Sequence, residues 1–320
     1  MTTYVSELRE MLAEGVEGVS SGLRDRVSGW LVSGQRADGG FAGPRGASDL
    51  YYAGFASRLA GILGLTEARF WDGLWKFLYQ SQRAVRDIPE AVSALLLKRE
   101  LDGVGRKACC PGSERLFIEG ALLAVEGFRC ADGGYSKTRG GPASAYHTFL
   151  AALCFELAER PMPGTEGIGE VLGGHRGPGG GYSDVVVGEA SAVEGTNATA
   201  AVVSLLSMFG RLDGETAEGA QAFLRSQQRA DEGFAATPTA PMADLMSTFT
   251  GLLTLVRLGG ASSVKLGGVG RYVKSLVLAD GSFGASIGDR TGDVEYGYYG
   301  LGTLSLLARE VARVRRAHAC

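Results

Sequence analysis

Two kinds of hydrophobic stretch alternate along the chain. The first has apolar residues at helical spacing on one face, as in AEGAQAFLRSQQ (Ala217–Gln228), and predicts a half-exposed amphipathic helix. The second has small and apolar residues on nearly every face, which is typical of a buried helix. The alternation predicts an all-α fold with two concentric layers, in which outer helices pack around inner helices. The predicted inner helices are Asp49–Leu63, Ile88–Leu101, Ala143–Leu157, Ala192–Leu206, Asp244–Leu258 and Asp293–Leu307.

A glycine-rich phrase lies between the two stretches of most pairs. Glycine allows the tight reversal and the positive φ that a turn between two helices needs. The copies are GQRADGGF (34–41), a degenerate SQRAVRD (81–87), RCADGGY (129–135), HRGPGGGYSD (175–184), SQQRADEGF (226–234) and LADGSF (278–283). They recur roughly every 45–50 residues, which indicates a repeat architecture. We therefore predict one domain of six repeats, at about residues 1–64, 65–105, 113–160, 165–212, 213–260 and 261–320.

The composition argues against several classes of protein. The chain has 320 residues, 45% of them hydrophobic, and can bury a substantial core. A formal charge of −3 and the lack of a basic block argue against nucleic-acid binding. Five cysteines without a CxxC spacing do not resemble a disulfide framework or a zinc ribbon. The first 20 residues lack the apolar core of a signal peptide, and no apolar run is long enough for a membrane span, so we expect a cytoplasmic protein.

The helical pairs with Q-x-x-D-G-G-F-type turns, over about residues 22–310, resemble the α/α toroid of protein prenyltransferase β subunits and class II terpene cyclases. GDVEYGYYGLGTLSLLARE (Gly292–Glu310) is similar to the last inner helix of geranylgeranyltransferase β subunits. The resemblance implies parallel inner helices around an apolar funnel that holds an isoprenoid, with diphosphate at the rim. Independently, six parallel helices would bring their positive dipole ends and unpaired N–H groups to one mouth.

The zinc site of the prenyltransferases is degenerate in this sequence. The resemblance places its Asp, Cys and His ligands on Asp244, Met246 and Tyr296. A thioether and a phenol do not replace a thiolate and an imidazole as zinc ligands. We therefore expect no zinc and no resident cofactor, and Mg²⁺ only as the companion of a diphosphate substrate.

Candidate substrate-binding residues lie at and just before the inner helices. Basic residues ahead of the helices, among them Lys137, could bind diphosphate, or they could be solvated loop charges. The aspartates that open helices could equally be helix caps. Tyrosines could shape an isoprenoid pocket and stabilise a carbocation, or could be ordinary core. The candidates are Arg45, Asp49, Tyr51, Arg139, Tyr146, Asp244, Arg290, Tyr296 and Tyr299.

Four residues are candidates for catalysis. Terpene cyclases start their reaction with the middle Asp of D-x-D-D, and AVEGT (192–196) resembles that motif with Glu194 at the acid position. In DVEY (293–296), Glu295 follows Asp293 by two residues. A carboxyl group on an apolar wall has a raised pKa and stays protonated, as such an acid requires. His147 lies one turn into its helix and is either a diphosphate donor, a general acid or a buried, hydrogen-bonded side chain.

Three functions stay open on the sequence alone. The first is a zinc-free prenyltransferase relative that acts on an isoprenoid diphosphate, together with a helical partner subunit. The second is a terpene cyclase that uses a single carboxylic acid and needs no partner. The third is a non-catalytic toroid that binds an isoprenoid, a related apolar molecule or a partner protein.

Overall fold

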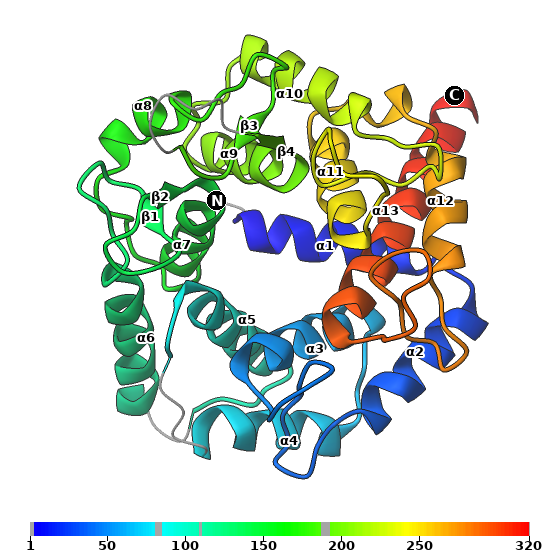
Figure 1. Ribbon diagram of the computed structural model, residues 1–320. Coiled ribbons are helices and arrows are strands. Elements are labelled where there is room, and N and C mark those ends of the chain that lie inside the picture. The colour runs from blue at the N-terminus through cyan, green and yellow to red at the C-terminus, as the bar shows by residue number, and fades with distance from the viewer. Residues whose placement is uncertain (1–2, 81–84, 109–110, 187–192, 320) are drawn as a thin grey trace.

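The computed structural model describes residues 3–80, 85–108, 111–186 and 193–319. Helices in these ranges form an inner ring and an outer ring, so the predicted all-α fold with two layers is confirmed (Figure 1). The inner helices are α3 (Leu50–Leu63), α5 (Ile88–Gly103), α7 (Ala145–Leu157), α9 (Thr196–Met208), α11 (Leu245–Arg257) and α13 (Val294–Ala319). The outer helices are α2 (Ser21–Ser33), α4 (Ala68–Gln80), α6 (Pro111–Glu126), α8 (Ile168–Gly173), α10 (Gly214–Ser226) and α12 (Leu266–Ser275).

Burial explains why the two kinds of helix occupy different layers. In α5 the side chains on every face are buried, and the charged Lys98 and Glu100 are among them. In α4 only one face is buried, from Phe70 to Leu78. An amphipathic helix can cover a core but cannot lie within it. The hydrophobic pattern therefore assigns each helix to its layer.

The glycine phrases form the turns at the N-terminal ends of the inner helices. The aromatic residue that closes each phrase is buried between the layers: Phe41, Tyr135, Tyr182, Phe234 and Phe283. Two short hairpins accompany the turns, one pairing β1 (Tyr135–Ser136) with β2 (Ala143–Ser144), the other β3 (Tyr182–Ser183) with β4 (Glu194–Gly195). In the degenerate second copy, residues 81–84 lie outside the described residues.

Among the described turns, the one in SQQRADEGF departs from the glycine pattern. Gly281 has φ +95°, and glycine adopts this left-handed conformation without strain. In SQQRADEGF the corresponding position is Glu232, which has φ +72°. The Glu232 carboxylate pairs with Arg271 of α12 at 2.8 Å. An ion pair therefore accompanies a backbone conformation that costs a non-glycine residue about 1–2 kcal/mol.

Neighbouring repeats are joined by backbone hydrogen bonds. The first N–H of α7, from Ala145, donates to the carbonyl of Asp184 in the next repeat, at 2.8 Å. The same bond recurs one repeat later from Thr196 of α9 to Ala236. It recurs again from Leu245 of α11 to the carbonyl of Ala285. Each of these inner helices is thus completed by the loop of the repeat that follows.

Helix α1 (Tyr4–Val16) belongs to neither ring. It crosses the middle of the ring in Figure 1 and packs most closely on α13, where an added Cβ on Gly15 would lie 2.0 Å from the carbonyl oxygen of Ser305. The hydrophobic pattern did not predict this position. Among the described helices, none is long and apolar enough to cross a membrane. Cys109, Cys110 and Cys320 lie outside the described residues.

Candidate functional site

Carboxylates cap inner helices at the mouth of the barrel, which is the end where these helices begin. Asp49 accepts a hydrogen bond from the N–H of Tyr52 at 2.8 Å, and Asp244 accepts one from Ser247 at 2.7 Å. Asp293 likewise accepts from the N–H of Tyr296. In each of the three, burial is the main cause of a raised carboxyl pKa. These contacts agree with the helix-cap alternative for the three aspartates, because each carboxyl group accepts from one N–H group at the start of α3, α11 or α13.

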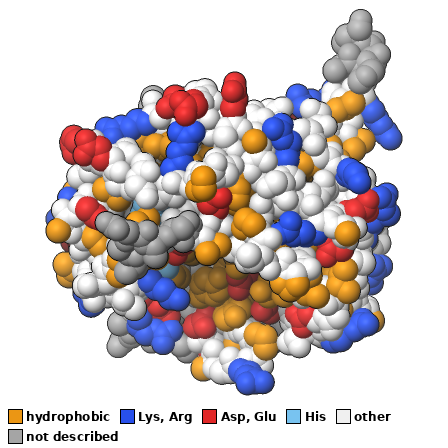
Figure 2. All heavy atoms as spheres, turned by 45° about the horizontal axis from the view of Figure 1, so that its top comes forward, with side chains coloured by type: hydrophobic (Ala, Val, Ile, Leu, Met, Phe, Trp, Pro, Cys, Tyr) orange, Lys and Arg blue, Asp and Glu red, His pale blue; other side chains and the backbone are white. Residues whose placement is uncertain are grey.

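The three arginines of the predicted basic rim have different surroundings. Arg45 and Arg290 are exposed. Arg139 lies over the ring of Phe128, 4.8 Å from its centroid, and donates to the carbonyl of Gly127 in the turn after α6. The hollow visible in Figure 2 contains hydrophobic and acidic side chains. This end of the barrel is thus richer in carboxylates than the sequence interpretation assumed.

Glu295 is the most perturbed of these carboxyl groups. It lies in the first turn of α13, and its side chain is 8% exposed. The Tyr51 hydroxyl of α3 donates to its Oε1 at 2.8 Å. The pKa of Glu295 is raised to about 7, mainly by burial and also by the nearby charge of Asp293, although the Tyr51 hydrogen bond and Arg58 lower it. At slightly acidic pH the side chain is therefore a neutral acid.

Aromatic rings form the wall beside Glu295. Tyr51 packs edge-on to Phe55 with centroids 5.0 Å apart, and Phe55 in turn contacts Tyr298 and Tyr299 of α13 at 5.7 and 5.4 Å. Phe249 of α11 closes the cluster against the same two tyrosines. Helices far apart in sequence thus contribute rings to one buried aromatic cluster. The face of an aromatic ring attracts a cation.

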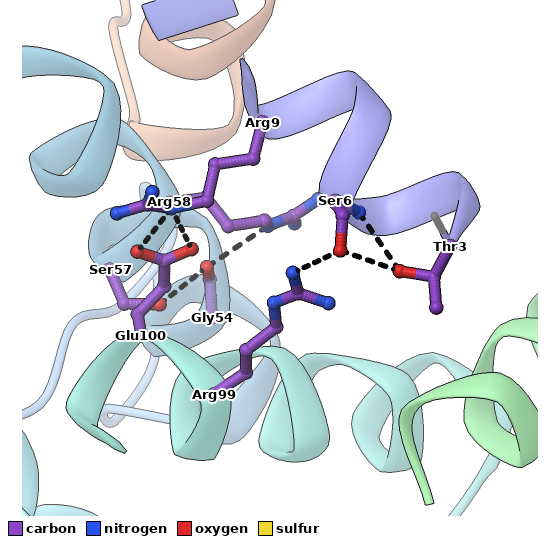
Figure 3. Close-up of polar contacts among 8 residues, drawn as sticks. All are labelled: Thr3, Ser6, Arg9, Gly54, Ser57, Arg58, Arg99 and Glu100. Carbon is purple, nitrogen blue, oxygen red and sulfur yellow. Dashed lines mark hydrogen bonds and ion pairs between the residues drawn. The ribbon is translucent and has the colours of Figure 1, made fainter. Parts of the chain in front are cut away.

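Arg58 is a central residue that the sequence interpretation missed. Its guanidinium lies 4.0 Å from the centroid of Phe55 and 4.6 Å from that of Tyr298, and its Nε donates to the carbonyl of Gly54 (Figure 3). It lowers the pKa values of both Glu295 and Glu100. A single arginine within a helix with small and apolar residues on most faces carried no motif, so only its neighbours in space identify it.

His147 has the contacts of a structural side chain. Its Nδ1 lies 2.9 Å from the Ser144 hydroxyl, which itself donates to Asp184 at 2.8 Å. Burial lowers the pKa of His147, with a further lowering by Lys137. The geometry agrees with the buried, hydrogen-bonded alternative. Asp184, which also accepts from the N–H of Tyr146, was not singled out in the sequence.

Glu194 holds a turn together. Its Oε1 accepts hydrogen bonds from the N–H groups of Gly179 and Gly181, at 2.9 and 3.0 Å. These glycines belong to the phrase of its own repeat. Although AVEGT resembles an acid motif, the structure places Glu194 at a glycine turn and not at the aromatic wall. Ala192 of this segment lies outside the described residues.

The positions of the degenerate zinc site serve other contacts. Asp244 caps α11, Met246 lines a cavity inside the barrel, and the Tyr296 ring contacts that of Tyr299. Within the described residues, no group of three or more His, Cys, Asp or Glu side chains is placed to hold a metal ion.

Two cavities of about 60 Å³ each lie inside the barrel. One lies among α7, α9, α11 and α13 and is lined by Tyr146, Met246 and Tyr299, and the other lies among α3, α5 and α1. Tyr4 of α1 lines both. A wider groove of about 840 Å³ runs along α12 and the C-terminal part of α13, and its lining shares no residue with the Glu295 site.

This arrangement of inner and outer rings is an α/α toroid. Residues 189–319 match the family model of the prenyltransferase alpha-alpha toroid domain. No curated protein sequence gives a significant match.

Solved structures share the fold at low sequence identity. The type II terpene cyclase MstE from Scytonema is 15% identical, with a TM-score of 0.59 over 92% of this chain and 98% of that one. The protein geranylgeranyltransferase-I of Candida albicans, complexed with GGPP, is 12% identical, with a TM-score of 0.62 over 80% and 83%. A possible GH105 family member from Klebsiella pneumoniae is 15% identical, with a TM-score of 0.58 over 92% and 93%.

These likenesses confirm the toroid that the repeats and glycine phrases indicated. At such identities they establish the fold alone, since one fold carries several chemistries. A variant of the Scytonema cyclase is known in complex with its substrate, geranylgeranyl dihydroxybenzoate, with 13% identity and a TM-score of 0.60 over 93% of this chain and 99% of that one. The reaction of this chain must be argued from its own side chains.

Proposed function

We propose that the toroid binds an isoprenoid-type hydrocarbon in its aromatic interior and that Glu295 is the acid of a terpene-cyclase-type reaction. The buried Glu295 carboxyl, hydrogen-bonded by Tyr51, carries the proposal. Its neutral form has a proton to give, and Oε1 is already bonded to Tyr51, so Oε2 is the oxygen that carries the proton. Two neighbours bind isoprenoids, GGPP in one and geranylgeranyl dihydroxybenzoate in the other, which supports an isoprenoid here.

The proposed chemical step is a proton transfer. The Oε2–H bond of Glu295 breaks, the π electrons of an alkene form the new C–H bond, and a carbocation results. The rings of Phe55, Phe249 and Tyr299 are placed to stabilise that charge. Loss of a proton from the product cation to a base or to water completes the balance. Arg58 orders two of the wall rings and holds Glu295 more acidic than burial alone would.

A prenyltransferase that grips diphosphate at this mouth is the weaker proposal. The carboxylates of Asp49, Asp244 and Asp293 repel an anion unless Mg²⁺ intervenes, and they occupy the helix ends that would otherwise bind phosphate. Of the three degenerate positions, Met246 and Tyr296 do not offer the donors that zinc prefers. We therefore propose a zinc-free protein that needs no diphosphate for its chemistry.

The test is product formation from geranylgeraniol, farnesol and their diphosphates, with gas chromatography of the extracts. We expect cyclic hydrocarbons or alcohols from the wild type. Glu295→Gln keeps the hydrogen bond from Tyr51 but has no acidic proton, so turnover should fall by about 10²-fold or more. Wild-type turnover should also fall as pH rises through about 7, where Glu295 loses its proton.

Glu194→Gln is the matched comparison, because it alters the other sequence-predicted acid. Turnover should survive it if Glu295 is the acid. Full activity of Glu295→Gln would remove Glu295 from the mechanism. Binding of the alcohols without any product would leave a non-catalytic isoprenoid-binding toroid, and absence of binding would exclude the proposal as a whole.

A further inference from the structure

Helix α1 closes the end of the barrel that lies opposite the acidic mouth. The backbone N–H groups of Tyr4 and Val5 both donate to the carboxylate of Glu156 at the C-terminal end of α7, at 2.9 and 3.0 Å. Glu7 pairs with Arg257 at the C-terminal end of α11 at 3.0 Å. These contacts lie at the ends of the inner helices that are remote from Glu295.

Other residues of α1 also form ion pairs and hydrogen bonds with the inner helices. Arg9 pairs with the buried Glu100 of α5 at 3.1 Å, and Arg99 of the same helix donates to Ser6 at 2.7 Å (Figure 3). Glu14 pairs with Arg309 of α13 at 2.8 Å. The helix is thus held by partners on several inner helices.

Tyr4 of α1 reaches into the interior of the barrel. Its ring packs edge-on to Phe149 of α7, with centroids 5.4 Å apart, and the Arg257 guanidinium lies 4.4 Å from its centroid on another side. Its hydroxyl lies 3.4 Å from that of Ser204 on α9. The side chain is 8% exposed and lines both interior cavities.

The two cavities are small when separate. Each holds about 60 Å³, whereas pockets for drug-sized ligands hold about 300 Å³ or more. Beyond Tyr4, the second cavity is lined mainly by apolar side chains such as Leu8, Leu96 and Leu153, and the charged Arg9, Arg58 and Glu100 also line it. Because Tyr4 lines both cavities, its ring lies between them.

We infer that Tyr4 is a specificity-determining residue that sets the depth of the interior, and so the length of the apolar chain that the toroid accepts. The inference deepens the proposed function, on which its biological meaning rests, but the physical claim concerns any linear hydrocarbon chain. Removing the ring joins the two cavities, and the added length is lined mainly by apolar side chains of α1, α3, α5 and α7.

The experiment measures dissociation constants for the linear alcohols hexanol, decanol and tetradecanol. These alcohols have no alkene, so the result does not depend on acid catalysis by Glu295. Tyr4→Ala should raise the ratio of tetradecanol to hexanol affinity by tenfold or more over the wild type, since each buried methylene adds to binding. Tyr4→Phe keeps the ring and should leave the ratio within about twofold of the wild type.

Tyr4→Trp provides an independent variant, because it enlarges the barrier where Tyr4→Ala removes it. It should lower the same ratio, and it keeps the test decisive if Tyr4→Ala does not fold. Equal ratios in the wild type, Tyr4→Ala and Tyr4→Trp would overturn the inference, as would a failure of every variant to bind any of the alcohols. A length shift with linear alcohols but no binding or conversion of prenyl alcohols would uphold Tyr4 and refute the proposed isoprenoid function.

Discussion

The two ends of the barrel solve opposite electrostatic problems. At one end, the N-termini of α3, α11 and α13 meet Asp49, Asp244 and Asp293, which accept their free N–H groups. At the other end, Arg257 in the last turn of α11 meets the acidic Glu7 of α1. Negative groups at helix N-termini and positive groups at C-termini both favour the helix dipole.

The two ends also differ in whether their side chains can gain or lose a proton near neutral pH. Several carboxyl groups of the N-terminal mouth have raised pKa values, and Glu295 there can change its protonation near neutral pH. The opposite end is filled by a helix whose polar groups are mostly paired. One end is therefore suited to chemistry and the other to limiting the space behind it, although the same repeats build both.

The largest expected effect comes from the titration of Glu295. The folded chain keeps this proton up to about pH 7, whereas the unfolded chain releases it near 4.5, so rising pH destabilises the folded state between these values. The full shift corresponds to about 3 kcal/mol. Relative to Glu295→Gln, the wild type should lose about that much unfolding free energy between pH 4.5 and 7.5 in urea titrations. Parallel pH profiles for the two proteins would contradict the raised pKa.

A second test disturbs the packing of α1 on α13 at the closed end of the barrel. Gly15→Ala places a methyl group against the backbone of Ser305, so α1 must shift away from α13. Forced overpacking of this kind typically costs 1–3 kcal/mol, and we expect about 2 kcal/mol in urea unfolding, with faster proteolysis within α1. Gly22→Ala is the control, since an added Cβ there meets nothing within 4 Å. Equal stability of the two variants would show that α1 is not held tightly.

A smaller effect is expected at a capping residue of the mouth. Asp244→Ala removes the acceptor for the N–H of Ser247 and should cost about 1 kcal/mol. Asp244→Asn keeps an oxygen acceptor without the buried charge, and should match or exceed the wild type in thermal unfolding at neutral pH. If Asn is as damaging as Ala, the charge of Asp244 matters more than its capping bond.

The smallest effect concerns the turn that lacks glycine. Glu232→Gly relieves the strain of a positive φ at this position, but it also removes the ion pair with the exposed Arg271. We expect a net gain of about 0.5 kcal/mol in the free energy of unfolding. Arg271→Ala, measured beside it by thermal unfolding, reports the ion pair alone. A loss of stability in Glu232→Gly greater than that in Arg271→Ala would mean that the backbone at this turn is not strained.

The fold was accessible from the sequence because it depends on patterns that repeat. The predicted inner stretch Asp244–Leu258 differs from α11 (Leu245–Arg257) by one residue at each end. Helix α1 was missed because it occurs once. A single amphipathic helix carries no information about which surface it covers, and its partner α13 is separated from it by nearly the whole chain.

The site was only partly accessible for the same reason. Glu295 could be singled out as a candidate because its neighbours in sequence resemble a family motif, but its hydrogen bond to Tyr51 joins residues far apart in the chain. Glu194 matched a motif equally well and lies instead over a glycine turn. A short motif specifies only the types of neighbouring residues. The burial and the hydrogen-bond partners of a side chain depend on how the whole ring of helices closes.

The bonds between successive repeats also have a consequence for synthesis on the ribosome. Helix α7 receives the acceptor for its first N–H only when Asp184 of the next repeat has emerged, and α9 and α11 wait in the same way for Ala236 and Ala285. Helix α1 is synthesised long before α13, the helix on which it packs. Such distant contacts slow folding. The nascent chain therefore carries an unfinished edge and an undocked amphipathic helix until α13 has emerged, which is the interval in which a chaperone would be most useful to it.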